Sequence, residues 1–541
     1  MYKSPLIAVI TVPLLLLAGC GPKGSVETAG SNSAEPAADN MSTIVVTAEL
    51  APPASPAAPV VAIQGFVVSR AADSERYQDT PANPVYRVAQ APVSTFSVDV
   101  DTASYANVRR FLVQGQRPPT DAVRVEEMIN YFPYDYKRPT DRKVPFAITT
   151  DVAATPWNPG TRLLRLALRG YDVTAAERPP ANLVFLVDVS GSMDSPDKLP
   201  LVQASLRRLT ARLRPDDRVA IVVYAGAAGL VLPSTNDKAA ILAAVERLKA
   251  GGSTAGGEGL MLAYATARAS YIKGGINRIL LATDGDFNVG ITSDERLEDL
   301  VSREKDSGIT LTTLGFGAGN YNDAMMETIA DAGNGNAAYI DSAIEADKVL
   351  GEELESTLFT IAGDVKVQVE FNPRVIAEYR LIGYENRVLA EEDFDNDKVD
   401  AGDIGAGHRV TALYEVALVG GPGLRLPERR YAANRPVVPA GSAAEMAVVK
   451  LRYKLPGERT SRLIEQPLAA NLVATTAPPK GEFAFAAAVA AFGQKLAGSK
   501  YLGDYSWTQI TALAGPQSDY SRSEFIKLVG LASASNSSAG E

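Results

Sequence analysis

The chain has 541 residues, and since domains usually hold about 100–200 residues, we expect roughly three or four folded units. Apolar residues make up 46% and charged residues 21% of the sequence, which is typical of globular proteins and argues against fibrous or wholly disordered chains. The 53 Lys and Arg against 63 Asp and Glu give a net charge of −10, which repels phosphate backbones. We therefore exclude a nucleic-acid partner.

Histidine and cysteine are nearly absent, since His408 and Cys20 are the single residues of their kinds. A Ser-His-Asp triad, a Cys-His pair or a zinc site of Cys and His ligands therefore lacks its residues. The remaining groups that could bind a metal ion are carboxylates, hydroxyls, amides and backbone groups, which suit hard cations such as Mg²⁺.

The N-terminus has the pattern of an export signal. Lys3 precedes an apolar run over residues 6–18, which is too short to span a bilayer, and small residues lead to Cys20. The end of the run, Leu-Ala-Gly-Cys, resembles the bacterial lipoprotein cleavage signal, which implies a lipid on Cys20 and attachment to a membrane. Gly21 after the cysteine favours the outer over the inner membrane. An ordinary signal peptide with an incidental cysteine stays open.

The next part of the chain, up to residue 92, is rich in Ala, Pro, Ser, Asn and Thr, which predicts a disordered linker. Alternating polar and apolar residues over 94–101 then predict a strand. Apolar spacing over 105–114 and 123–132 predicts two helices, and further strands are expected over 145–152 and 162–168.

From residue 182 strands and helices alternate, which predicts βαβ units and an α/β fold with a doubly wound, mainly parallel sheet. Residues 183–187 form a continuous apolar run, as expected of a strand covered on both faces. The following predicted strands are 219–224, 278–282 and 310–316. The last predicted helix of this unit covers residues 346–358.

Polar residues lie where the strands of this sheet end, which is where open α/β sheets bind their ligands. These residues are Asp188, Ser190, Ser192, Thr254 and Asp284. We expect them to converge on one spot. Their motifs, Asp-Val-Ser-Gly-Ser, Gly-Gly-Ser-Thr-Ala-Gly-Gly and Thr-Asp-Gly, resemble the three segments of the metal-ion-dependent adhesion site (MIDAS) of von Willebrand factor type A (VWA) domains. Five positions in the family's order are far more specific than Asp-x-Ser-x-Ser alone, which often caps a helix.

This resemblance implies how the site works. The hydroxyls of Ser190, Ser192 and Thr254 would bind Mg²⁺ directly, while Asp188 and Asp284 would hold it mostly through waters; Mn²⁺ and Ca²⁺ are alternatives. The open coordination position would accept a Glu or Asp carboxylate from a partner protein. The resemblance also implies a two-state shift of the last helix of the domain.

A narrower resemblance covers residues 94–105, 126–134 and 182–358, which look like the YfbK-type bacterial lipoproteins. It implies an N-terminal family-specific segment, a VWA domain and a further C-terminal domain. The predicted parts are a signal peptide (1–19), a lipid-anchored linker (20–92), an N-terminal α+β domain (93–175), the VWA domain (180–360) and a C-terminal domain (361–541).

The C-terminal part is first β-rich and then helical. Alternation over 365–371, 375–381 and 409–417 predicts a β-sandwich, and the strands before the VWA domain are expected to pair into the same sandwich. Residues 481–532 have helical spacing and are expected to pack against it. The acidic stretch 393–397 is not an EF-hand, because Lys398 replaces the required glycine.

A nucleotide partner is not predicted, because the Gly-rich stretch 251–259 has no Walker lysine and the stretch 315–319 lacks the dinucleotide spacing. His408 is interpreted as a loop or strand-edge residue. The favoured function is a non-enzymatic envelope lipoprotein that binds a protein partner through its metal. The alternatives are a structural scaffold whose metal stabilises the fold, and a metal-assisted hydrolase with Asp286 or Glu258 as its base.

Overall fold

The computed structural model describes residues 75–98, 100–174, 176–252, 256–285, 294–305, 307–427, 429 and 444–538. The predicted signal peptide, the lipidation site Cys20 and the linker up to residue 74 lie outside these residues. Among the described helices, none combines the length and apolarity needed to cross a membrane.

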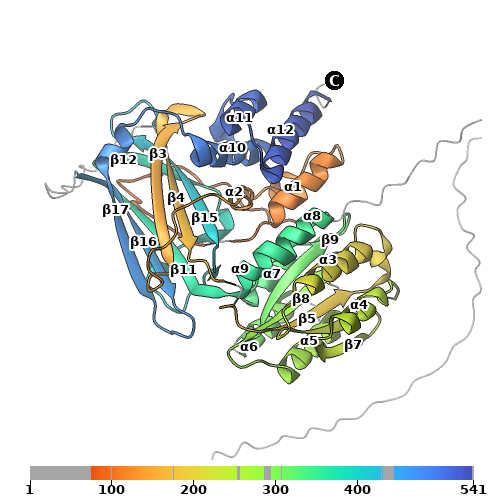
Figure 1. Ribbon diagram of the computed structural model, residues 1–541. Coiled ribbons are helices and arrows are strands. Elements are labelled where there is room, and N and C mark those ends of the chain that lie inside the picture. Colours follow the sequence, from red (N-terminus) through yellow and green to blue (C-terminus); the bar gives the residue numbers. More distant parts are fainter. Residues whose placement is uncertain are drawn as a thin grey trace, which may run out of the picture. The chain divides into compact units, whose positions relative to one another are not determined.

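An α/β domain occupies the middle of the chain (Figure 1). Its six-stranded sheet has the order β10-β9-β8-β5-β6-β7, and only β7 runs antiparallel to its neighbour. The strands are β5 (Ala181–Asp188), β6 (Arg218–Tyr224), β7 (Ala228–Thr235), β8 (Ile276–Thr283), β9 (Thr310–Phe316) and β10 (Ala337–Ile340). The predicted doubly wound fold is confirmed, although the sequence patterns did not predict β7 and β10.

Helices cover both faces of this sheet because its strands are apolar on both sides. Leu183, Phe185 and Val187 of β5 pack on one face with α3 and α4, whereas Val184 and Leu186 pack on the other face with α5, α6 and α7. The helices are α3 (Leu199–Arg212), α4 (Lys238–Glu246), α5 (Gly256–Ala269), α6 (Asp294–Lys305) and α7 (Asp323–Ala332).

The last helix of the domain is interrupted. The sequence predicts one helix over 346–358, but the structure contains α8 (Ala343–Asp347), a π-helical segment η3 (Lys348–Glu353) and α9 (Leu354–Leu358). Such π-helical turns insert an extra residue into a helix and frequently occur at functional sites.

The rest of the chain forms two antiparallel sheets with the orders β1-β12-β15-β4-β3 and β13-β2-β11-β16-β17, with β14 paired to β11. Strands from both sides of the α/β domain share these sheets, as the sequence predicts. The strands before it are β1 (Tyr86–Arg87), β2 (Val93–Ser97), β3 (Phe146–Thr155) and β4 (Asn158–Gly170). Those after it are β11 (Thr360–Phe371), β12 (Ile376–Ile382), β13 (Val388–Leu389), β14 (Ile404–Gly405), β15 (Arg409–Leu418), β16 (Glu445–Lys454) and β17 (Arg462–Ala469).

A helical layer packs on one of these sheets. Its core joins Phe485, Phe492 and Phe525 to Leu163 of β4 and Leu413 of β15. The helices are α1 (Ala103–Val113), α2 (Val125–Asn130), α10 (Gly481–Leu496), α11 (Trp507–Ala514) and α12 (Tyr520–Ser538). The segments 93–175 and 361–541 therefore share both a sandwich core and a helical core.

Residues 75–92 have fixed partners although the sequence places them in the linker. The backbone N–H of Arg76 donates to the carbonyl of Tyr321, and the N–H of Asp323 donates to the carbonyl of Arg76, each over 2.9 Å. Strand β1 pairs with β12. Because these backbone groups find distant partners, the ordered part of the chain begins before residue 93.

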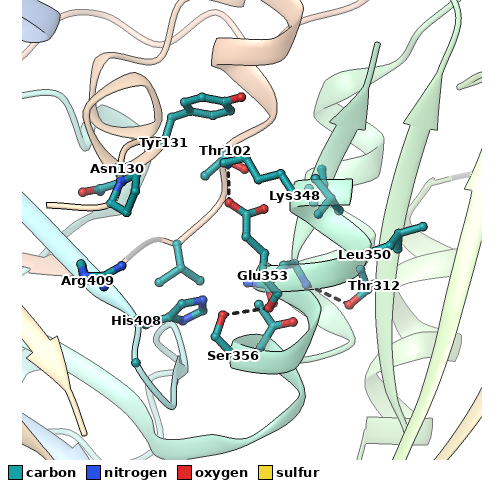
Figure 2. Close-up of a pocket in the computed structure, with 18 of the residues that line it drawn as sticks. Thr102, Asn130, Tyr131, Thr312, Lys348, Leu350, Glu353, Ser356, His408 and Arg409 are labelled. Atoms are coloured by element: carbon teal, nitrogen blue, oxygen red, sulfur yellow. Dashed lines mark hydrogen bonds and ion pairs between the residues drawn. The ribbon is translucent and has the colours of Figure 1, made fainter. Parts of the chain in front are cut away.

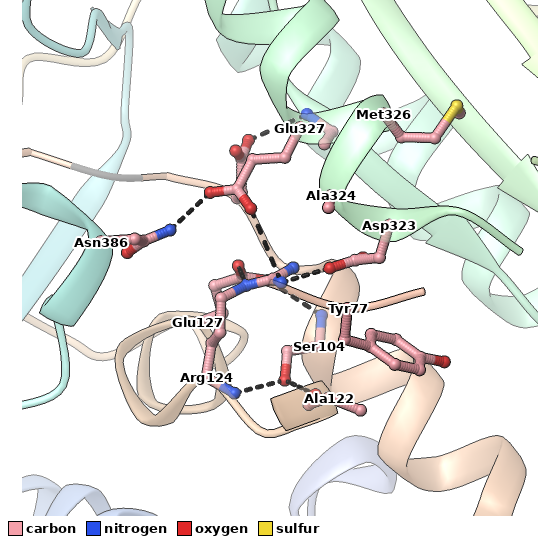
Figure 3. A network of polar contacts seen from close by, with 12 residues as sticks. Tyr77, Ser104, Ala122, Arg124, Glu127, Asp323, Ala324, Met326, Glu327 and Asn386 are labelled. Carbon is pink, nitrogen blue, oxygen red and sulfur yellow. Dashed lines mark hydrogen bonds and ion pairs between the residues drawn. The ribbon is translucent and has the colours of Figure 1, made fainter. Parts of the chain in front are cut away.

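Buried ion pairs join the α/β domain to the N-terminal segment. Arg124 bonds Glu127 and Asp323 and lies 3.6 Å from Oε2 of Glu327 (Figure 3). Arg109 of α1 bonds Asp341 at 2.5 Å and Glu345 of α8 at 2.6 Å. These contacts fix the N-terminal segment against α7 and against the interrupted last helix.

Candidate metal centre

Four of the five predicted metal ligands lie where the sequence places them. Asp188 is the last residue of β5, Asp284 directly follows β8, and Ser190 and Ser192 lie in the loop after β5. Strands β5 and β8 are parallel neighbours in register, so their carboxyl ends bring the two aspartates to one edge of the sheet. Both aspartates are fully buried, whereas Ser192 is exposed.

Hydrogen bonds shape the loop after β5. The Ser190 N–H donates to Oδ1 of Asp188 over 2.8 Å, and the hydroxyls of Ser190 and Ser192 lie 3.0 Å apart. The other carboxylate oxygen of Asp188 accepts a bond from Thr283 Oγ1 at 3.2 Å. The two serine hydroxyls therefore lie side by side, next to the buried Asp188 carboxylate, which hydrogen bonds fix in place.

The fifth predicted ligand, Thr254, lies outside the described residues. The residues before it approach the same loop, because the Gly191 N–H donates to the carbonyl of Gly252 over 3.0 Å. The Gly251 N–H also donates to the carbonyl of Val189, over 2.8 Å. Gly251 and Gly252 therefore lie against the loop that carries Ser190 and Ser192.

A lysine that sequence reasoning missed completes the polar cluster. Lys198 Nζ donates to Oδ2 of Asp284 over 2.9 Å and to Oδ1 of Asn320 over 3.1 Å. Its aliphatic chain passes over Gly317, where an added Cβ would lie 2.3 Å from Lys198 Cγ. Nothing in the sequence marks Lys198 as part of the site, because a lysine directly before a helix is common.

The two aspartates have different protonation behaviour. Burial raises the pKa of Asp188 to about 6, and the hydrogen bonds from Ser190 act against this rise. Burial also acts to raise the pKa of Asp284, but hydrogen bonds from Lys198 and Ser192 outweigh it and lower that pKa. Asp284 is therefore held as an anion by its lysine.

The donor set fits a hard divalent cation. Hydroxyl and carboxylate oxygens are the ligands that Mg²⁺ prefers, and the two serine hydroxyls already lie close to both aspartates. Among the described residues, no three His, Cys, Asp or Glu side chains gather in a way that could hold a metal ion. The candidate site thus depends on hydroxyls, and Lys198 offsets one of its two carboxylate charges.

Of the two residues considered as the general base of a hydrolase, Glu258 forms no hydrogen bond or ion pair with this cluster in the described part of the chain. Glu258 is exposed in the first turn of α5, and Asp286 lies outside the described part of the chain. The described groups beside Asp188 and Asp284 are hydroxyls, an amide and an ammonium.

Comparisons with known proteins identify the domains. Residues 182–352 match the von Willebrand factor type A domain, residues 71–165 match a family described as von Willebrand factor, and residues 356–534 match "Uncharacterized protein YfbK, C-terminal". The chain is 50% identical over 469 residues to "Uncharacterized protein YfbK" of Escherichia coli K12, covering 84% of this chain and 81% of that protein. The chain belongs to the YfbK family.

Other relatives share smaller parts. "Uncharacterized protein sll0103" of Synechocystis is 35% identical over 187 residues, which are 34% of this chain and 43% of that protein. The solved structure "von Willebrand factor type A from Catenulispora acidiphila" covers 74% of this chain and 91% of that one, with 17% identity and a TM-score of 0.40. The match of residues 182–352 to the family model makes the central domain of this YfbK-family chain a VWA domain, a type that commonly mediates protein–protein interaction.

Proposed function

We propose that this protein is an envelope lipoprotein that binds a protein partner through a divalent cation, with Mg²⁺ as the first candidate. The main support is the convergence of Asp188, Ser190, Ser192 and Asp284 at the carboxyl ends of β5 and β8. Thr254 would supply the third hydroxyl. A cation held mainly by neutral hydroxyls keeps an affinity for an anion, so a Glu or Asp carboxylate of the partner would complete its coordination.

The charge of Lys198 fits this role. Two carboxylates and one ammonium leave the empty site with one net negative charge, and a divalent cation converts this into one net positive charge. One carboxylate from a partner would then neutralise the loaded site. We infer that the site is adapted to capture a single acidic side chain.

The metal test uses the full chain with Cys20→Ser, so that it can be purified without lipid. Calorimetry is expected to show one Mg²⁺ site that Ser190→Ala and Thr254→Ala each weaken by about tenfold or more. Ser195→Ala is the matched control, because Ser195 lies in the same loop but bonds Asp197. Unchanged affinity in both site variants would exclude the site.

The binding test compares envelope proteins captured by this chain in Mg²⁺, in EDTA and with Thr254→Ala. Proteins retained only by the metal-loaded parent chain, and released by free glutamate in excess, would support carboxylate capture. If metal binds and raises the melting temperature while capture is the same in all three conditions, the metal has a structural role and the scaffold alternative replaces the adhesion proposal.

The membrane attachment is proposed from Cys20 and the residues before it. Metabolic labelling with a palmitate analogue is expected to mark the parent protein and not Cys20→Ser, and outer-membrane fractions are expected to contain the labelled protein. Label in both proteins, or in neither, would contradict lipidation at this residue.

A further inference from the structure

A cavity of about 280 Å³ lies where three parts of the ordered chain meet. The interrupted last helix of the VWA domain forms one wall, residues 130–133 after α2 form another, and the loop before β15 closes the third side (Figure 2). None of the four described metal ligands lines it. It is therefore a separate site.

The only histidine of the chain faces this cavity. Figure 2 shows the His408 ring pointing from the loop before β15 toward Ser356 and Glu353. Its Nδ1 accepts a hydrogen bond from the Gly405 N–H over 3.2 Å. In a neutral imidazole the other nitrogen, Nε2, then carries the proton and is a donor directed into the cavity.

His408 is neutral at pH 7. Burial lowers its pKa to about 4, and the nearby guanidinium groups of Arg409 and Arg278 act in the same direction. Nε2 can therefore donate a hydrogen bond at pH 7 without a change in protonation. The charges of Arg409 and Arg278 near the ring can then act on a bound ligand.

Arg278 is a buried cation that lies behind the lining residues Thr312 and Thr357 and forms no ion pair with the described residues. Its guanidinium donates to Thr310 Oγ1 at 2.8 Å, to Thr312 Oγ1 at 3.3 Å and to the carbonyl of Thr357 at 3.1 Å, and only 3% of the residue is exposed. Among the described residues no carboxylate forms a salt bridge with it, although Asp403 acts on its charge from farther away. Asp403 compensates this buried charge only in part, and an anionic ligand would offset the remaining cost.

Three further charged side chains line the cavity: Lys348, Glu353 and Arg409. Lys348 pairs with Glu353 and lies 3.6 Å from the ring centre of Tyr131, so these two side chains neutralise each other. Arg409 also lines the cavity, and its buried Nε has no hydrogen-bond partner within the described part of the chain. Arg409 and Arg278 are therefore the cations that act on the His408 ring beside this cavity.

Part of the cavity wall is apolar. Val100, Leu314, Val349 and Leu350 line the cavity together with Ala338. Pockets of this kind, with apolar walls and a few directed polar groups, are typical of small-molecule sites, and this volume is near the lower end of their range. A compact ligand with one acidic group and an apolar body matches both features.

We propose that this cavity binds a small organic monocarboxylate, whose acid group accepts the hydrogen bond of His408 Nε2 and offsets the buried charge of Arg278. The apolar body would lie against Val349, Leu350 and Leu314. This binding is independent of the metal centre and of the adhesion function.

Nuclear magnetic resonance tests this directly, because the single histidine gives one set of imidazole signals. The full chain with Cys20→Ser is titrated at pH 7 with benzoate and, separately, with its neutral isostere benzamide. EDTA is present, so that benzoate cannot bind through a metal. We expect saturable shifts of the His408 signals with benzoate and at least tenfold weaker binding of benzamide.

Two variants locate the site. Ser356→Leu fills the cavity while it keeps the imidazole reporter, and it is expected to abolish the benzoate shifts. His408→Phe removes the donor, and calorimetry is expected to show at least tenfold weaker benzoate binding with an unchanged circular dichroism spectrum. Equal binding of benzoate and benzamide, no shift at millimolar benzoate, or full shifts in Ser356→Leu would each overturn the proposal.

Discussion

Lys198 donates a hydrogen bond over 2.9 Å to Oδ2 of Asp284, a carboxylate that is completely buried at the candidate metal centre. The lysine is itself only 8% exposed. The Lys198 ammonium and a metal ion would both interact with the Asp284 carboxylate. Because two cations repel each other, the lysine should weaken metal binding and the metal should weaken the contact between Lys198 and Asp284.

Replacing Lys198 should therefore change the affinity for the metal ion and the affinity for the partner's carboxylate in opposite directions. Lys198→Met is expected to bind Mg²⁺ about tenfold more tightly, because a repulsive charge is removed, and to retain its protein partner more weakly. In EDTA the variant should be less stable by about 3 kcal/mol, since Asp284 is left buried without its ion pair. Calorimetry and thermal melts check both effects.

Lys249→Met is the control, because Lys249 is exposed on the same domain. Tighter partner binding in Lys198→Met, or equal Mg²⁺ affinity in both lysine variants, would contradict the charge argument.

Gly317 offers an independent way to move the same lysine. It has a φ of +74°, and a Cβ there would overlap the methylene groups of Lys198. Gly317→Ala is expected to lower the free energy of unfolding by about 1–3 kcal/mol and to shift Mg²⁺ affinity in the same direction as Lys198→Met. Gly319→Ala provides the match, because Gly319 also has a positive φ but no neighbouring atom within 4 Å of the added Cβ. Similar Mg²⁺ shifts in both variants would show that backbone strain, not Lys198, is responsible.

The stability of the protein should depend on the protonation of His408. Its pKa is lowered from 6.5 to about 4 in the folded chain, so the neutral form stabilises the fold fully above pH 6.5. This contribution is lost as the pH falls through 4, with a limit of about 3 kcal/mol. The difference in unfolding free energy between parent and His408→Gln, measured from pH 7 to 4, should shrink accordingly. A difference that stays constant over this range would contradict the assigned pKa.

Arg109 should be a major contributor to the attachment of the VWA domain. It bonds Asp341 and Glu345 in that domain and lies 3.1 Å from a carboxylate oxygen of Glu524 in α12. Arg109→Met leaves these buried acids without their cation, which is expected to cost about 3–5 kcal/mol. Chemical denaturation measures this, and Arg117→Met, at an exposed arginine, should stay within about 0.5 kcal/mol of the parent. A small loss in Arg109→Met would mean that the domain is held mainly by apolar contacts.

The sequence predicted the features that depend on local pattern. The apolar run 183–187 predicted a buried strand, and the polar residues at the strand ends predicted a candidate site, because parallel strands end at one edge. Lys198 was missed, since its partner Asp284 is distant in the chain and only folding brings them together. The break in the helix over 346–358 was missed for a similar reason: its residues have ordinary helical spacing, and the π-helical segment lies among tertiary contacts such as Lys348 against Tyr131.

The shared sandwich has a consequence for the order of events during synthesis. Thr161 of β4 bonds Glu415 of β15, which lies 254 residues later in the chain. At a synthesis rate of about 5–20 residues per second, roughly 13–50 s pass between the synthesis of β4 and that of its neighbour β15. Throughout this interval β3 and β4 can pair only with each other, so the edge of β4 that later pairs with β15 stays open while the VWA domain is synthesised. The nascent chain therefore carries an unpaired apolar edge that a chaperone, or rapid folding of the inserted domain, must keep from aggregating.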